Sequence, residues 1–195
     1  MPGSYKVSLA IMTKGETKEL SEAVLFICKP LGLVTFQAID QKAKYTWLNE
    51  ASEFSRRMYG TISYTTELVN KVNAVMQAIN QTSGASEGLM NEAEKINNEL
   101  DNIMFIFNGP VVKASQEELP PMDMPLSQRL SEMASASYGT SGDISIIAKE
   151  QLDILKTEFP PVLTRVKKAG EDLQKLDKQL DAIKAPWTPG RVPVL

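Results

Sequence analysis

The longest regular pattern of apolar positions lies in the last third of the chain. From Gly142 to Ile183, apolar residues recur at steps of mostly three and four, which is the stripe of an amphipathic α-helix. A helix over this range is roughly 60 Å long at 1.5 Å per residue, so it needs a partner of similar length to cover the stripe. The stripe consists of Ile144, Ile147, Leu152, Leu155, Phe159, Val162, Val166, Ala169, Leu173, Leu176, Leu180 and Ile183.

Two prolines stand inside this pattern. Pro160 and Pro161 each remove a helical hydrogen bond and clash with the preceding turn, at a cost of about 3 kcal/mol or more. The stripe nevertheless keeps its phase from Phe159 through Val162 to Val166. Two helices joined by a loop would keep that phase only by chance, so the sequence predicts one continuous, kinked helix.

A second long stripe predicts a helix from Gln41 to Ile79, with Asp40 as its N-cap. Gly60 inside it costs on the order of 1 kcal/mol relative to alanine, and we expect it to mark a close helix contact or a bend. The two long helices match in length and are expected to pack together. The second stripe consists of Trp47, Ala51, Phe54, Met58, Ile62, Thr65, Leu68, Val72, Val75 and Ile79.

Two shorter helices are predicted between the long ones. One runs from Ser86 to Phe107 and ends at Asn108-Gly109-Pro110, where the glycine suits a left-handed cap and the proline cannot continue the helix. The other runs from Leu126 to Ser137. We expect an ordered surface loop over 111–124 and take Ser141 as the cap of the final helix. The inward residues are Leu89, Ala93, Ile96, Leu100, Ile103 and Phe107 in the first and Leu126, Leu130, Met133 and Ala134 in the second.

The start of the chain has the period of β-strands. Apolar and polar residues alternate from Tyr5 to Ile11, and Leu20 to Cys28 supplies a second strand. The polar stretch from Met12 to Glu19 is the expected connection of a hairpin. An isolated two-stranded hairpin is marginal in water, so this one needs more sheet or a helix to lie on.

These patterns together predict a mainly α fold. The expected architecture is an antiparallel helical bundle of about four helices, two of them very long, with an N-terminal two-stranded β-hairpin. We expect three segments: a hairpin over 1–34, the bundle over 35–184 and an extended tail rich in proline and tryptophan over 185–195.

Composition removes several classes of chemistry. The chain has 195 residues, a formal net charge of -3 and no histidine, so Ser/His/Asp and Cys/His catalysis and His-ligated zinc are excluded. Cys28 is the lone cysteine and is expected to be a buried small hydrophobe. We expect no catalytic residue, no cofactor, no metal site and no nucleic-acid partner. We expect no membrane insertion either, because no apolar run approaches roughly 18 residues.

Three pairs of carboxylates invite a catalytic interpretation: Glu92 with Glu94, Glu117 with Glu118, and Glu171 with Asp172. Glycosidases need two carboxyl groups that face each other across a sugar, about 5 to 9.5 Å apart. Residues this close in sequence generally point apart, and a di-iron bundle would need histidines that the chain lacks. We therefore expect these carboxylates to be solvated surface groups.

The tail is the most specific part of the sequence. It contains Pro186, Trp187, Thr188, Pro189, Gly190 and Arg191. Its prolines forbid a helix, so we expect it to leave the bundle in an extended form. Trp187 is expected to anchor the tail by packing on the hairpin or on the helix ends. The alternative is that Trp187 stacks on a ligand.

Both ends of the chain resemble parts of a known family. The opening Pro2-Gly3-Ser4-Tyr5 resembles the Pro-Gly-Thr-Tyr segment that starts the penultimate strand of immunoglobulin-like sandwiches, although a free-standing hairpin packed on the bundle is the alternative. The tail Ala-Pro-Trp-Thr-Pro-Gly-Arg over 185–191 resembles the C-terminus of bacterial sialidase-like, sortilin-type β-propeller proteins labelled glycosyl hydrolases. In that family the propellers are followed by a small β-sandwich and then by a helical region.

The resemblance implies a secreted or periplasmic parent protein whose C-terminal module is this chain. Its partners would be upstream β-propeller and β-sandwich domains, with a protein or glycan ligand for the whole. The chain holds no propeller repeat or sialidase arginine cluster, so no hydrolase residue carries over, and it starts without a signal-peptide pattern. The alternatives are an independent coiled-coil module that oligomerises or binds a protein, and a glycan-binding or hydrolase accessory domain.

Overall fold

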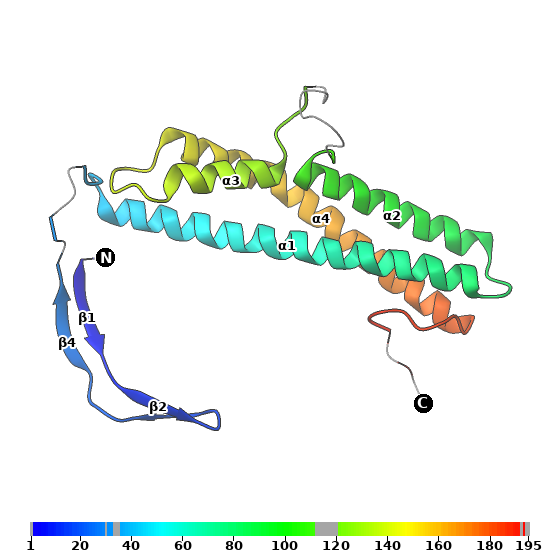
Figure 1. Cartoon of the computed structure of the whole chain (residues 1–195), viewed down its shortest axis with the longest axis horizontal. Coiled ribbons are helices and arrows are strands. Elements are labelled where there is room, and N and C mark those ends of the chain that lie inside the picture. The colour runs from blue at the N-terminus through cyan, green and yellow to red at the C-terminus, as the bar shows by residue number, and fades with distance from the viewer. Residues whose placement is uncertain (1, 30, 33–35, 112–120, 192, 194–195) are drawn as a thin grey trace. The chain divides into compact units, whose positions relative to one another are not determined.

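The computed structural model of this chain is mainly helical and carries an N-terminal antiparallel β-hairpin (Figure 1). It describes all residues except 1, 30, 33–35, 112–120, 192 and 194–195. In the described part, the helices are α1 (Gln41–Gln81), α2 (Glu87–Asn108), α3 (Leu126–Ser137) and α4 (Ile146–Ala182). The strands are β1 (Gly3–Val7), β2 (Ala10–Thr13), β3 (Glu16–Glu19) and β4 (Val24–Cys28).

Contacts divide the chain into two compact units. The first comprises Met1–Leu48 with Thr140–Asp143, and the second comprises Asn49–Gly139 with Ile144–Leu195. These units do not coincide with the segments predicted from the sequence. The first turns of α1 belong with residues 140–143, and the tail belongs with the helices.

The hairpin is a long ribbon built from two paired stretches. β1 pairs with β4, and β2 pairs with β3, both antiparallel. Two residues separate β1 from β2, whereas four residues separate β3 from β4, so the ladder is interrupted where the sequence predicts continuous strands. The turn is also tighter than the predicted connection over 12–19. Lys14 and Gly15, with φ of 52° and 86°, form its centre, as a type I′ turn requires.

The helix boundaries agree with the sequence to within a few residues, apart from the start of the last one. α3 has the predicted limits, and α1 begins at Gln41 behind the predicted cap, where Oδ1 of Asp40 accepts from the backbone N–H of Ala43 at 2.9 Å. The predicted cap of the final helix is wrong. α4 begins only at Ile146, and the side chain of Ser145 accepts from the backbone N–H of Ala148.

The ion pairs and hydrogen bonds between the helices show which of them are parallel and which are antiparallel. Glu50 near the start of α1 pairs with Lys156 near the start of α4, and Lys71 further along α1 pairs with Asp177 further along α4. The two long helices are therefore parallel. α2 and α3 both run against α4 (Figure 1). α2 and α3 therefore follow one another in the same direction along α4, and they meet where the Ser127 hydroxyl donates to the side-chain oxygen of Asn108.

The core of this unit follows the predicted stripes. Phe159 of α4 lies at its centre, 5.6 Å from the ring of Phe54 in α1 and 6.5 Å from the ring of Phe107 in α2. All the inward residues predicted for α2 are buried. In α4 the predicted stripe is buried from Leu152 to Leu180, but Ile147, near its start, is 56 % exposed.

α4 continues through its two prolines, so a break at this point is excluded. Pro160 and Pro161 are both exposed, on the side of the helix away from buried Phe159 and Val162. The carbonyl groups that lose their helical donors therefore face water, which can satisfy them. This is why the stripe keeps its phase across both residues.

Two small residues differ from the expectation, Cys28 in its burial and Gly60 in one of its two expected roles. A side chain at Gly60 would meet nothing within 4 Å, so this glycine does not mark a close helix contact. The close approach occurs instead at Gly170, where an added Cβ would lie 2.6 Å from the hydroxyl oxygen of Tyr64. Cys28 is exposed rather than buried, because the ribbon that carries it has no core of its own.

Candidate functional site

The ribbon formed by Gly3–Cys28 is exposed along its whole length. Tyr5 lies opposite Phe26, and Val7 lies opposite Val24, on one face of the β1–β4 pair. The two rings stack with their centroids 5.7 Å apart. Even so, Phe26 is 47 % exposed and both valines are more than half exposed. This face is therefore apolar, and no described residue covers it enough to bury it.

β4 is apolar on both of its faces. Val24, Phe26 and Cys28 point to one side, and Leu25 and Ile27 point to the other, because neighbouring residues in a strand alternate. Leu25 and Ile27 are 63 % and 64 % exposed. Strands that are apolar on both faces are typical of buried positions in sheets. The sequence of β4 is therefore typical of a buried strand, although all of its residues are exposed.

The segment after the ribbon is held by hydrogen bonds to residues 140–143. The backbone N–H of Ala38 donates to the carbonyl of Ser141 at 3.0 Å, and the Ser141 hydroxyl donates to the carbonyl of Phe36 at 2.6 Å. The Lys44 ammonium donates to two carbonyls, those of Thr140 at 2.5 Å and Gly142 at 2.7 Å. Ser141, predicted as a helix cap, thus serves to fix this segment.

The tail does not leave the bundle in an extended form, and that prediction is wrong. It turns back after α4, and its Ala185, Thr188 and Arg191 are buried. Arg191 holds the turn closed. Its guanidinium donates to Oδ1 of Asp181 at 3.0 and 2.5 Å and to the carbonyl of Pro186 at 2.8 Å.

Trp187 is only partly buried and contacts Arg191 of the tail. Its side chain is 52 % exposed, and the Arg191 guanidinium lies 5.0 Å from the centre of its ring. This is a cation–π arrangement. The buried anchor of the tail is therefore Arg191, and Trp187 is the exposed residue that Arg191 supports.

A buried ion pair lies beside the tail. Lys71 of α1 pairs with Asp177 of α4, and both side chains are largely buried. The Lys71 ammonium lies 3.4 Å from the place that a Cβ on Gly190 would occupy, and Gly190 has φ of 85°. Glycine there allows the left-handed backbone, which residues with a Cβ rarely adopt. The remaining members of the predicted tail motif, Pro186 and Pro189, frame this turn.

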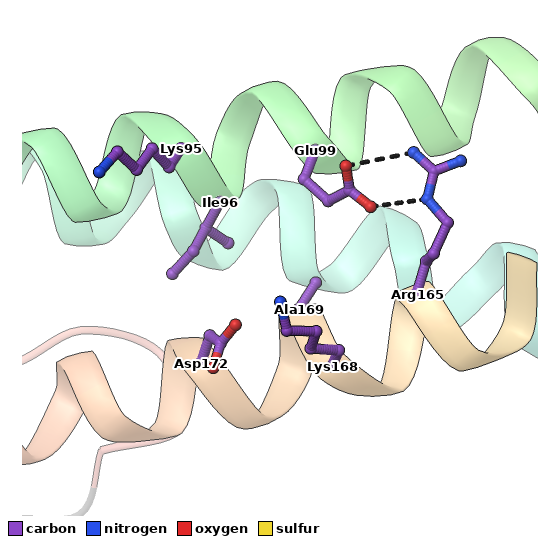
Figure 2. Close-up of a pocket in the computed structure, with 7 residues that line it drawn as sticks. All are labelled: Lys95, Ile96, Glu99, Arg165, Lys168, Ala169 and Asp172. Atoms are coloured by element: carbon purple, nitrogen blue, oxygen red, sulfur yellow. Dashed lines mark hydrogen bonds and ion pairs between the residues drawn. The ribbon is translucent and has the colours of Figure 1, made fainter.

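A groove of about 420 Å³ lies between α2 and α4 (Figure 2). Buried Ile96 and Ala169 line it from the two helices. Figure 2 shows Glu99 and Arg165 facing each other, joined by hydrogen bonds of 2.7 and 3.1 Å. The groove continues past Asp172 towards Lys175, Glu92 and Gln179.

The charges of this groove are mostly satisfied within it. The Arg165 guanidinium holds the pKa of Glu99 below its usual value, chiefly through the hydrogen bonds. Asp172 pairs with Lys175 at 2.8 Å. Lys95 and Lys168 also line the groove. A carboxyl group whose pKa is lowered in this way, as at Glu99, suits an ion pair and does not suit a general acid, which must carry a proton near neutral pH.

The predicted carboxylate pairs do not assemble into one site. Glu92 and Asp172 line the groove, but Glu94 and Glu171 are not among its lining residues. Glu117 and Glu118 lie outside the described residues, as does most of the loop predicted over 111–124. Among the described residues, no group of three or more metal-binding side chains comes together. In the same part of the chain, no helix is long and apolar enough to cross a bilayer.

Sequence reasoning missed the partners of the two buried cations. Asp177 carried a signal, because it lies between Leu173 and Leu180 on the apolar side of the last helix, where a charge needs a partner. Asp181 carried none, since its pairing with Arg191 depends on how the tail turns.

Comparisons with protein-family models, curated proteins and solved structures gave no significant match to this chain.

Proposed function

We propose that this chain is a non-catalytic structural and interaction module in which a helical bundle is joined to a docking ribbon. The observation that carries the proposal is the exposure of every residue from Gly3 to Cys28 in a ribbon rich in apolar side chains. A two-stranded hairpin of this kind is marginal in water by itself. Contiguous exposed apolar surface is typical of interaction sites.

The resemblance at the two chain ends suggests the partner. In the family of sialidase-like β-propeller proteins, this chain would be the C-terminal module of a secreted or periplasmic polypeptide. Its ribbon would then be the last strand pair of an immunoglobulin-like sandwich, and β-domains ahead of it would cover the apolar face. The exposed face with Tyr5 and Phe26 suits such a role, because one inner face of each sheet is buried in a sandwich.

A non-catalytic role is supported by the groove between α2 and α4. Its Glu99 and Asp172 are engaged by Arg165 and Lys175. The two alternatives have less support. A coiled coil between chains needs a free helix stripe, but the main stripes of α1, α2 and α4 are buried within one chain. A sugar platform at Trp187 would have one aromatic side chain that already contacts Arg191.

The first test is enzymatic. We expect the purified chain to be folded, to be helical by circular dichroism and to release no product from aryl glycosides, sialosides included, above the rate in buffer. Turnover that disappears in the Glu92→Gln variant would contradict the non-catalytic role, because Glu92 lines the groove and forms no ion pair with any of the described residues.

The second test addresses the docking ribbon. We expect the gene to encode β-structured domains ahead of residue 1, and amide hydrogen exchange in residues 3–28 to be slower in that longer polypeptide than in this chain. Val7→Asp combined with Val24→Asp should remove this protection, because the two side chains lie opposite each other on the apolar face. Lys18→Asp, on β3, is the matched control. Equal exchange in the two polypeptides would refute the docking role.

A further inference from the structure

We infer that the outer edge of β4 binds a second copy of this chain, so that two ribbons form one four-stranded antiparallel sheet. The inference rests on the proposed function only in treating the ribbon as an interaction element. The surfaces differ, since the proposed function uses the apolar face of the ribbon and this inference uses a backbone edge.

The edge of β4 lacks the features that keep exposed strands from pairing. Among the described residues, β4 pairs only with β1, so its other edge presents unpaired backbone groups. From Ala23 to Cys28 the strand contains no charge and no proline. Natural edge strands are usually protected by lysine, proline or a bulge, and an unprotected edge binds another strand.

The edge of β1 differs in this respect. Lys6 is the fourth of the five residues of β1 and lies opposite Leu25 of β4. An antiparallel pair of two β1 strands would bring the lysines of both copies close together, and like charges at such positions are destabilising. Within the β1–β4 pair, the outer edge of β1 therefore carries a lysine and the outer edge of β4 carries no charge, and the second copy is expected at β4.

The charges at the two ends of β4 select a second copy as the occupant. Glu22 precedes the apolar stretch and Lys29 follows it. In an antiparallel pair of two β4 strands, Glu22 of each copy comes within one position of Lys29 of the other. A parallel pair would bring equal charges together at both ends. The segment is thus complementary to itself in the antiparallel direction, within the roughly 10 Å over which charges act at 0.1 M salt.

This arrangement closes on itself. A two-fold axis through an antiparallel pair of identical strands passes through a residue that faces its own copy, here Leu25 or Phe26, and both centres place Glu22 near Lys29 of the partner. The assembly stops at two chains, because β4 of each is used once and the outer edges carry Lys6. The sheet then has the order β1-β4-β4-β1, and its enlarged apolar face stays available for docking.

The experiment is sedimentation equilibrium of the full chain over a hundredfold range of concentration. We expect a dimer of twice the chain's 21.5 kDa. Ile27→Lys should raise the dissociation constant of the dimer at least roughly tenfold, because it adds a charge to the outer edge of β4. Met12→Lys on β2 is the matched control. Ile27 lies opposite Ser4, Met12 lies opposite Thr17, and both side chains are more than 60 % exposed.

A charge exchange tests the direction of pairing without touching the apolar residues. Glu22→Lys alone and Lys29→Glu alone should each weaken the dimer, and the double variant should restore the wild-type dissociation constant. A monomeric wild-type chain, an Ile27→Lys variant that dimerises like the wild type, or a double variant that stays weak would overturn the inference.

The two proposals fail separately. A monomeric chain whose ribbon gains protection in the longer polypeptide would refute self-pairing and leave the docking role intact. A dimer whose ribbon gains no further protection there would refute the docking role alone.

Discussion

The ribbon and the helical bundle are both rich in apolar residues, yet only one of them has a core. Phe26 in the ribbon is 47 % exposed, and Phe159 in the bundle is 4 % exposed. Phe159 contacts rings from two other helices, whereas Phe26 stacks on one ring across a single strand pair. Burial therefore depends on the number of elements that surround a side chain, and two strands are too few.

The largest test of this comparison removes one aromatic ring from each region. We expect Phe159→Ala to lower the free energy of unfolding by about 3–5 kcal/mol, because it leaves a cavity among three helices. Phe26→Ala should change it by less than about 0.5 kcal/mol, as is usual for exposed positions. Urea unfolding followed by circular dichroism at 222 nm measures both. Equal losses in the two variants would show that the ribbon is part of the bundle's cooperative core.

The next effect concerns the tail, which belongs to the bundle through one buried cation. Arg191→Met should cost about 1–2 kcal/mol, because it removes hydrogen bonds to Asp181 and Pro186. In a Trp47→Phe background, the fluorescence of Trp187 should also become less anisotropic. Lys175→Met is the control, since the Lys175 side chain is 70 % exposed in its pair with Asp172 and should matter little. An unchanged anisotropy would contradict the role of Arg191 as the anchor.

A smaller gain is expected at Gly60. An added Cβ there meets nothing within 4 Å, and the residue lies inside α1. Gly60→Ala should therefore raise the free energy of unfolding by about 1 kcal/mol, from helix propensity alone. Gly190→Ala is the opposite case, since its backbone has φ of 85° and Lys71 lies close, and it should destabilise. A loss of stability in Gly60→Ala would contradict the open space around Gly60 and indicate that another molecule contacts α1 at this position.

The smallest effect is the pH dependence from Glu99. Arg165 lowers the pKa of this carboxyl group, so the native state binds its proton less readily than the unfolded state does. The resulting stabilisation is full above the unfolded pKa near 4.5 and is lost as the pH falls below it. It should amount to a few tenths of a kcal/mol, because the Glu99 side chain is 40 % exposed. Urea midpoints of wild type and Glu99→Gln at pH 7 and pH 3 measure it. If the wild type gained stability over Glu99→Gln as the pH fell from 7 to 3, the result would contradict a lowered pKa of Glu99.

Local periodicity was enough to predict most of the helices. The limits of α3 and the buried residues of α2 agree with the sequence pattern, because a stripe of period 3.6 marks both the helix and its inner face. The phase across Pro160 and Pro161 also predicted a continuous α4. The start of that helix was placed too early, because several polar residues there can act as a cap and only the contacts made by Ser141 and Ser145 distinguish them.

The tail shows where local reasoning fails. Its prolines correctly exclude a helix, but they do not fix the direction in which the chain continues after α4. The turn depends on Arg191 reaching Asp181, a contact across ten residues that no periodic pattern reveals. The most conspicuous residue, Trp187, was therefore expected to be the anchor, whereas Arg191, which the sequence pattern does not single out, is the more deeply buried of the two.

By itself the sequence determined where the helices lie, which of their faces are apolar and that the first residues form a hairpin. These features follow from side-chain spacing and backbone preferences, which act over a few residues. The tertiary structure adds that α1 and α4 are parallel and that the tail closes on Asp181. These features depend on which distant segments meet, and many pairings of apolar faces satisfy the same local pattern.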